Sequence, residues 1–196
     1  QVFGNKFYKF PDFATFFICG RIGTGLRKAG VMFNLGILTI SDKGWRGQRY
    51  DESGKAIRNS PFVLDNSVLK YEVIPDEMDI IANKLAEWAD EGKVDIILTT
   101  GGTGLGPRDV TPEATLSIVD KVAPGFTEAM RTKAFKATPF AILSRAVAGV
   151  RGKCLIINLP GSPKAVRECL EIISPTLPHA VEILRGEVTE HATRGD

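Results

Sequence analysis

Short apolar runs alternate with helix-spaced apolar residues along the chain from about residue 32 onward. The pattern predicts strands at 35–40, 68–74, 94–98 and 154–157, each followed by polar residues. The run 94–98 is short, apolar and β-branched, which is typical of a central strand buried on both faces of a parallel sheet. Strands that alternate with helices indicate βαβ units. We therefore expect an α/β fold, a three-layer sandwich with a mostly parallel central sheet and helices on both faces.

Apolar residues at helical spacing indicate which side chains the helices bury. Met78, Ile81, Leu85 and Trp88 repeat in this way, so Trp88 is expected to pack in the core rather than to stack on a ligand. The last helix is expected to stop at Gly186, because glycine commonly ends helices in a left-handed conformation.

The first 31 residues differ from the rest of the 196-residue chain. They hold six phenylalanines without a clear period, and five basic residues against one acidic residue. We expect an N-terminal extension of unknown role at 1–31 and a single domain at 32–196. The apolar run 13–19 is too short to span a bilayer and lacks the pattern of a secretory signal, so no membrane partner is expected.

Charge and cysteine usage narrow the functional classes. The formal net charge is +2, and the main body shows no concentrated basic face, so no nucleic-acid partner is expected. Three cysteines without a C-x-x-C pair favour a reducing compartment, and we expect a cytoplasmic protein. Cys154 and Cys169 lie among apolar residues and are expected to be buried hydrophobes. Two histidines exclude a histidine-rich metal site.

A glycine-rich loop at 99–113 follows the central strand. It combines glycines with Thr99, Thr100 and Thr103, so that backbone N–H groups and hydroxyl groups can close on phosphate oxygens. It matches neither the Walker A spacing nor G-x-G-x-x-G. After the loop, Thr111 is expected to cap a helix whose first residue is Pro112. The alternative is a turn that only redirects the chain.

Other polar residues also follow predicted strands, and open α/β sheets bind ligands along the carboxyl edge of their strands. One crevice is therefore expected to collect Asp42, Asp76, the glycine loop, Asp109 and Lys164. Two aspartates beside a phosphate-type loop favour magnesium, a hard cation that takes carboxylate oxygens and substrate phosphates. The alternative is that the aspartates are turn or capping residues.

Several basic residues are candidates for anion binding. Lys164 is predicted in the first turn of a helix capped by Ser162, where the helix dipole disfavours a cation by roughly 0.3–1 kcal/mol, and a bound anion would reverse this effect. The alternative is a solvated surface lysine. Arg145 and Arg151 are further candidates, because guanidinium matches phosphate geometry. The segment 51–54 is typical of a helix entrance, with capping and functional roles both open.

With these residues assembled, the chain resembles the molybdopterin adenylyltransferase family, which includes bacterial enzymes of molybdenum cofactor synthesis and the G domain of gephyrin. The resemblance covers about 33–186 and is carried by separate blocks in the same order: 41–43, 74–77, 99–114, 124–131, 142–145 and 158–164. The ending Asn158 to Lys164 is similar to the adenylyltransferase branch, because related small proteins of uncertain role typically lack the lysine.

The resemblance implies Mg²⁺-dependent transfer of AMP from ATP to the terminal phosphate of molybdopterin, with release of pyrophosphate. It implies that Asp76 and Asp109 serve catalysis and hold the metal. Nucleotide and pterin binding are expected from Ser41, Asp42, Thr100, Gly101, Gly102, Thr103, Gly104, Ser144, Arg145, Asn158, Pro160, Gly161, Ser162 and Lys164. A homotrimer and a contact with the molybdenum insertase are further expectations. The rival functions are a non-catalytic pterin-binding delivery or scaffold module and an enzyme that acts on pyridine nucleotides.

Overall fold

The computed structural model describes residues 32–187. The chain divides into two units, Gln1–Gly30 and Val31–Asp196, and only the second contains described residues. The extension predicted at 1–31 lies outside the described residues and stays a prediction. Among the described residues, no helix is both long and apolar enough to cross a bilayer.

A six-stranded sheet with the order β2-β1-β3-β6-β5-β4 forms the centre of the domain. Its strands are β1 (Asn34–Ile40), β2 (Ser67–Ile74), β3 (Ile96–Thr100), β4 (Lys121–Val122), β5 (Ala148–Arg151) and β6 (Cys154–Leu159). The neighbours β2, β1, β3 and β6 pair in parallel, and β5 pairs antiparallel with both β6 and β4. The mostly parallel sheet is confirmed, and all four predicted strands are present. The central strand spans Ile96–Thr100 instead of 94–98, so Thr99 and Thr100 belong to the strand and not to the loop that follows it.

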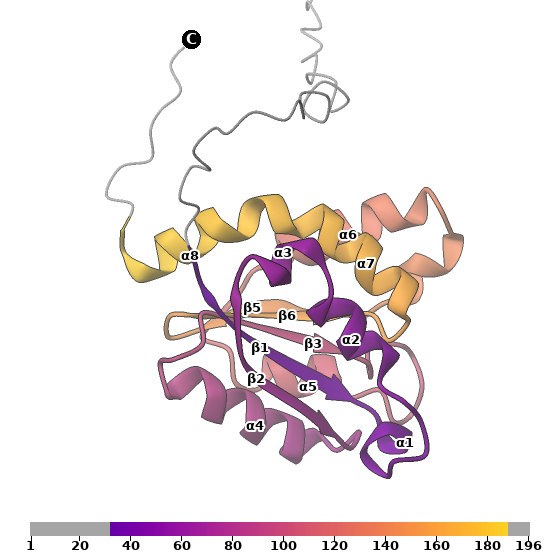
Figure 1. Ribbon diagram of the computed structural model, residues 1–196. Coiled ribbons are helices and arrows are strands. Elements are labelled where there is room, and N and C mark those ends of the chain that lie inside the picture. Colours follow the sequence, from indigo (N-terminus) through magenta and orange to yellow (C-terminus); the bar gives the residue numbers. More distant parts are fainter. Residues whose placement is uncertain (1–31, 188–196) are drawn as a thin grey trace, which may run out of the picture. The chain divides into compact units, whose positions relative to one another are not determined.

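Helices cover both faces of this sheet (Figure 1). One layer holds α2 (Glu52–Arg58), α3 (Pro61–Leu64), α6 (Pro124–Phe135), α7 (Pro163–Ile173) and α8 (Leu177–Arg185). The opposite layer holds α4 (Met78–Asp90) and α5 (Thr111–Leu116). The short elements are α1 (Asp42–Trp45), which follows β1, and the 3₁₀ helices η2 (Pro139–Leu143) and η3 (Ser174–Thr176). The three-layer sandwich is confirmed.

Alternating side chains of the strands build one apolar layer on each side of the sheet. Leu35 and Ile37 face the larger helical layer, whereas Leu38 faces the layer that contains Trp88. Trp88 is only 3% exposed, which confirms its predicted place in the core. It packs over Gly36, where a Cβ atom would lie 2.9 Å from the indole ring, so the strand needs glycine at this position.

The remaining core predictions are mostly confirmed. Cys154 and Cys169 are buried, and burial raises the pKa of each thiol to about 12, so neither is a poised nucleophile. Gly186 ends α8 in the left-handed conformation. Met78 differs from the prediction, because it is the first residue of α4 and is 42% exposed. The buried stripe of that helix begins at Ile81.

Candidate functional site

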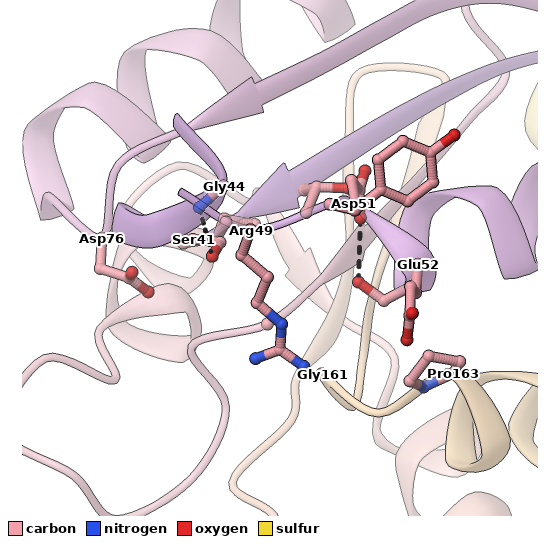
Figure 2. A pocket seen from close by; sticks show the side chains of 13 residues that line it. Ser41, Gly44, Arg49, Asp51, Glu52, Asp76, Gly161 and Pro163 are labelled. Atoms are coloured by element: carbon pink, nitrogen blue, oxygen red, sulfur yellow. Dashed lines mark hydrogen bonds between the residues drawn. The ribbon is translucent and has the colours of Figure 1, made fainter. Parts of the chain in front are cut away.

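A pocket of about 230 Å³ lies where the four parallel strands end, and Figure 2 shows its lining. It is lined by Thr39, Ile40, Ser41, Gly44, Arg49, Tyr50, Asp51, Glu52, Ser53, Asp76, Gly101, Gly161 and Pro163. Ser41, Asp76, Gly101 and Gly161 each come just after the carboxyl end of one of these strands. Of the residues predicted to share one crevice, Asp76 and Gly101 line this pocket, whereas Asp42, Asp109 and Lys164 are not among its lining residues.

Asp42, which follows β1, and Asp76, which follows β2, hydrogen-bond to each other. The Asp42 N–H donates to Asp76 Oδ2 at 2.7 Å, and the Asp76 N–H donates to Asp42 Oδ1 at 3.3 Å. Burial raises the pKa of Asp76 above its ordinary value, and the nearby Asp42 and Asp109 carboxylates raise it further. The hydrogen bond from the Asp42 N–H and the charge of Arg108 lower it, but by less. The side chain thus sits among negative charges, where a bound cation would be stabilised.

The glycine loop passes directly over these strand ends. Gly101 and Gly102 have φ angles of 100° and 62°, which favour glycine. A Cβ atom at Gly101 would lie 2.2 Å from the Ile40 carbonyl oxygen, and one at Gly102 would lie 3.3 Å from Asp76 Oδ1. The main chain of the loop and the Asp76 carboxylate are therefore neighbours, as expected if a cation is bound between the carboxylate and a phosphate group.

The Asp109 carboxylate lies inside the curl of the same loop. The Gly106 N–H donates to Asp109 Oδ2 at 2.8 Å, and a Cβ atom at Gly104 would lie 2.9 Å from that oxygen. Within residues 32–187, no group of three or more histidine, cysteine, aspartate or glutamate side chains is placed to hold a metal ion. Two carboxylates suit Mg²⁺, because this ion keeps several waters and completes its shell with substrate phosphates.

The predicted cap at Thr111 is wrong, because α5 begins at Thr111 and Val110 occupies the N-cap position. The Thr111 hydroxyl donates instead to the Gly101 carbonyl oxygen at 2.9 Å. A Cβ atom at Gly102 would lie 2.3 Å from this hydroxyl oxygen. Thr111 is therefore the first helical residue, and its hydroxyl joins the start of α5 to the glycine loop.

Thr100 and Asn158 lie beneath the pocket rather than in its lining. Both are fully buried. The Thr100 hydroxyl donates to the Pro160 carbonyl oxygen at 2.7 Å. Asn158 Nδ2 donates to the hydroxyl oxygens of Thr99 and Thr115 at 3.0 and 2.9 Å, and its Oδ1 accepts the Val147 N–H at 3.1 Å. The structure shows these two side chains supporting the site, and their binding role stays a prediction.

A second loop of the site, residues 160–162, connects β6 to α7. Ser162 caps this helix by accepting the Ala165 N–H at 3.2 Å, and Pro163 is the first helical residue, which confirms both predictions. A Cβ atom at Gly161 would lie 3.4 Å from Gly101 Cα, so this loop packs on the glycine loop. Lys164 therefore stands at the same edge of the sheet. Its side chain is 84% exposed, with Nζ 3.9 Å from Glu168 Oε1.

The structure separates the two predicted anion-binding arginines. Arg145 lies beside the glycine loop, with its guanidinium directed at loop carbonyls instead of the pocket. Arg151 pairs in the sheet with Cys154 at the opposite end of β6, where its guanidinium donates to Asp90 at 2.8 Å. Arg151 is therefore not part of the site.

An apolar hollow of about 220 Å³ lies on the other side of the second loop. Pro160 and Ala165 line it, whereas Gly161 and Pro163 line the polar pocket. Ser144 also lines the apolar hollow. The predicted residues Ser144 and Pro160 are thus placed next to the polar pocket and not within its lining.

For Asp51, a capping role and a functional role were both open from the sequence. Asp51 caps α2 by accepting the Gly54 N–H at 2.8 Å, and it also lines the pocket. Its Oδ2 accepts the Thr39 hydroxyl at 2.7 Å and the Tyr71 hydroxyl. The capping role is confirmed, and a functional role stays a prediction.

Arg49 and Arg108 also belong to this region, although neither was predicted from the sequence. Arg108 donates to both carboxylate oxygens of Asp42 and to Glu77 Oε1 at 2.7 Å. Arg49 extends into the pocket toward Gly161 (Figure 2), and in the described part of the chain its guanidinium has no hydrogen bond or ion pair. Arg49 lies in an irregular stretch, where no periodic signal indicates which way a side chain points.

Comparisons with known proteins agree with this geometry. A family model described as "Probable molybdopterin binding domain" matches residues 36–179. The chain is 46% identical over 155 residues to the molybdopterin adenylyltransferase of Helicobacter pylori, an alignment that covers 78% of this chain and 88% of the relative. It is 39% identical over 163 residues to gephyrin of Dictyostelium discoideum, covering 78% of this chain and 23% of gephyrin.

A solved structure gives the same result. The molybdopterin biosynthesis enzyme MoaB from Thermus thermophilus matches with a TM-score of 0.72 and 52% sequence identity, covering 79% of this chain and 98% of that one.

Proposed function

We propose that this chain, which belongs to the family of molybdopterin-binding domains, is a molybdopterin adenylyltransferase of molybdenum cofactor biosynthesis. In this reaction an oxygen of the terminal phosphate of molybdopterin attacks the α-phosphorus of ATP. The bond from that phosphorus to the oxygen bridging to the β-phosphate breaks, and pyrophosphate leaves. The products are adenylyl-molybdopterin and pyrophosphate.

One observation carries this proposal: the Asp76 carboxylate lies against the main chain of the glycine loop at the edge where four parallel strands end. Phosphoryl-type transfer needs alignment and charge neutralisation more than it needs an enzyme nucleophile. The site fits this requirement, because the two cysteines that the structure describes are buried and neither lines the pocket. Fixed N–H groups and hydroxyls can align two anionic reactants without forming a covalent intermediate.

Asp76 and Asp109 are proposed to hold Mg²⁺. When bound, the ion would neutralise charge on the triphosphate and orient it. Burial and the neighbouring carboxylates raise the pKa of Asp76, and a bound cation would counteract both by stabilising the ionised carboxylate. This supports a role for Asp76 in metal binding. Asp42 is proposed to line the nucleotide side, and its bonds to Asp76 and Arg108 hold it in place.

The anionic parts of the substrates are assigned to the two loops. Gly101, Gly102, Thr103 and Gly104 are proposed to cradle phosphate, and Ser162 and Lys164 are proposed to hold the phosphate of the pterin. Arg49 joins this set because its guanidinium enters the pocket without a partner among the described residues. A cytoplasmic homotrimer that contacts the molybdenum insertase completes the proposal, and a mass measurement in solution tests the trimer.

The test is to mix the purified protein with molybdopterin, ATP and Mg²⁺ and to measure pyrophosphate. The enzyme yields pyrophosphate in a one-to-one ratio with adenylylated pterin, and chelation of Mg²⁺ stops the reaction. Pterin binding without pyrophosphate would contradict the proposal and identify a delivery or scaffold module. A thermal-shift comparison of ATP with nicotinamide nucleotides tests the other rival, because a ligand at 100 times its Kd stabilises the fold by about 2.7 kcal/mol.

A further inference from the structure

Arg145 connects the segment before β5 with both ends of the irregular part of the glycine loop. Its Nε donates to the Gly104 carbonyl oxygen at 2.6 Å, and its Nη2 donates to the Asp109 carbonyl oxygen. Its backbone N–H donates to the Thr103 carbonyl oxygen at 2.9 Å, and its Nη1 pairs with Glu113. A single side chain thus closes the loop by joining residues that are five positions apart.

These bonds also decide where the loop presents its donors. In a trans peptide unit the C=O and the following N–H point in opposite directions. Because the Gly104 carbonyl faces the guanidinium, the Leu105 N–H faces away from it, and the same holds for Asp109 and the Val110 N–H. Arg145 therefore controls the orientation of loop amides and of the backbone that carries the Asp109 carboxylate.

The segment that carries Arg145 is itself held from the other side. Arg131 on α6 donates through Nη1 to the carbonyl oxygens of Ser144 and Ala146 at 3.4 and 3.1 Å. Its Nη2 donates to the Thr127 hydroxyl oxygen at 3.2 Å. The backbone on both sides of Arg145 is thus anchored to a regular helix, which gives the guanidinium a fixed base.

We propose that Arg145 is a positioning residue that sets the geometry of the glycine loop and of Asp109, and that it does not bind substrate phosphate directly. The part of this inference that concerns turnover rests on the adenylyltransferase function proposed above. The two roles differ in what the chemistry requires. Positioning needs the planar fork of arginine, whereas direct anion binding is partly preserved by the point charge of lysine.

The test compares Arg145→Lys and Arg145→Gln with the matched control Arg151→Lys. Arg151 also donates to a carboxylate and to a backbone carbonyl, but at the opposite edge of the sheet. We expect both Arg145 variants to lower kcat by about 100-fold, because small displacements of reacting groups have effects of this size. We expect any change in the Kd of ATP from calorimetry to agree within about threefold between Arg145→Lys and Arg145→Gln, because both variants lose the fork that holds the loop and the lysine charge does not replace it. Arg151→Lys is expected to keep the wild-type kcat.

A second readout does not depend on the reaction. Amide hydrogen exchange at 103–110 is expected to be about tenfold faster in Arg145→Lys than in the wild type, and unchanged there in Arg151→Lys. If Arg145→Lys keeps wild-type exchange and kcat, or if ATP affinity falls in proportion to the lost charge, the inference is overturned. If the wild type makes no pyrophosphate, the proposed function fails while the exchange result still decides this inference.

Should the Arg145 variants not fold, Glu113→Gln provides the decisive measurement. This change removes the ion pair of the guanidinium but leaves its carbonyl partners in place. A smaller increase in exchange at 103–110, with ATP affinity retained, supports positioning. Wild-type exchange together with weaker ATP binding would contradict it.

Discussion

The two edges of the parallel sheet each carry an aspartate, and these aspartates have different surroundings. At the amino edge, Asp95 accepts two hydrogen bonds from Arg185, at 3.0 and 2.9 Å, and the Asn34 N–H at 2.8 Å. At the carboxyl edge, Asp76 Oδ2 accepts the Asp42 N–H, and Oδ1 faces the glycine loop. Asp95 is saturated with partners that stabilise the fold, whereas Asp76 keeps an oxygen available beside other acids.

This difference teaches how to separate a structural acid from a functional one. A paired carboxylate in a folded protein has its charge balanced within the chain. Asp76 has a raised pKa, chiefly from burial, so the fold does not supply its counter-charge in full. Removing each charge should therefore affect different properties of the protein.

The largest expected effect is on turnover. Asp76→Asn and Asp109→Asn should each lower kcat by about 100- to 1000-fold, because they remove charge that holds the cation over the phosphates. Asparagine at 76 can still accept the Asp42 N–H, so the fold should survive. Pyrophosphate release measures the loss, and calorimetry with molybdopterin should show binding retained. Full activity in either variant would refute the assigned mechanism.

Asp95→Asn sharpens the comparison from the other edge. It should leave kcat unchanged and lower the free energy of unfolding by about 1–3 kcal/mol, because Arg185 loses its charged partner. Urea denaturation monitored by circular dichroism measures the change. An effect on kcat as large as that of Asp76→Asn would erase the distinction between the two edges.

A smaller effect is expected from Arg49→Gln. The guanidinium enters the pocket, and its loss should raise KM for the anionic substrates by about tenfold, equivalent to about 1.4 kcal/mol. The value of kcat should stay close to that of the wild type. Arg46→Gln is the matched control from the same segment, because Arg46 is not part of the pocket lining. Equal effects of the two changes would mean that general surface charge is responsible.

The smallest expected effect is on stability as a function of pH. Because the pKa of Asp76 is raised in the folded state, its contribution to stability is present below the ordinary carboxyl pKa and is lost as the pH rises through the raised value. In the absence of divalent cations, Asp76→Asn should therefore increase Tm at neutral pH, and this gain should shrink as the pH falls and vanish below the ordinary carboxyl pKa of 3.8, where the Asp76 carboxyl is protonated in both the folded and the unfolded protein. A lower Tm at neutral pH would show that the carboxylate stabilises the fold.

The sequence predicted the elements well where periodicity reports burial. The helix that buries Trp88 and the cap at Ser162 depend on local patterns, and the structure confirms them. The central strand is also present, but it spans Ile96–Thr100 instead of the predicted 94–98. The edge of the sheet that collects the polar residues followed from the parallel topology. These features need no knowledge of distant contacts.

The errors concern side chains whose partners lie far away in the sequence. Thr111 was expected to cap its own helix, but it is the first helical residue, and its hydroxyl donates to the Gly101 carbonyl oxygen. Arg145 and Arg151 have similar local sequences of small and apolar neighbours, and only the fold places them at opposite edges. The place of Arg49 in the pocket could not be predicted, because it lies in an irregular segment where no periodic pattern indicates the direction of its side chain.

The Asn158 side chain supports the glycine loop from below by donating to Thr99 and Thr115, so the loop depends on residues outside its own segment. The Thr115 hydroxyl gives its proton to the Thr111 carbonyl oxygen at 2.9 Å, so only its lone pairs remain to receive the Asn158 amide. An aspartate at 158 has no proton to offer there when ionised, and would leave two oxygens facing each other in a buried space. A designer who grafts the glycine loop onto a new scaffold must therefore bring Asn158 and Thr115 along with it.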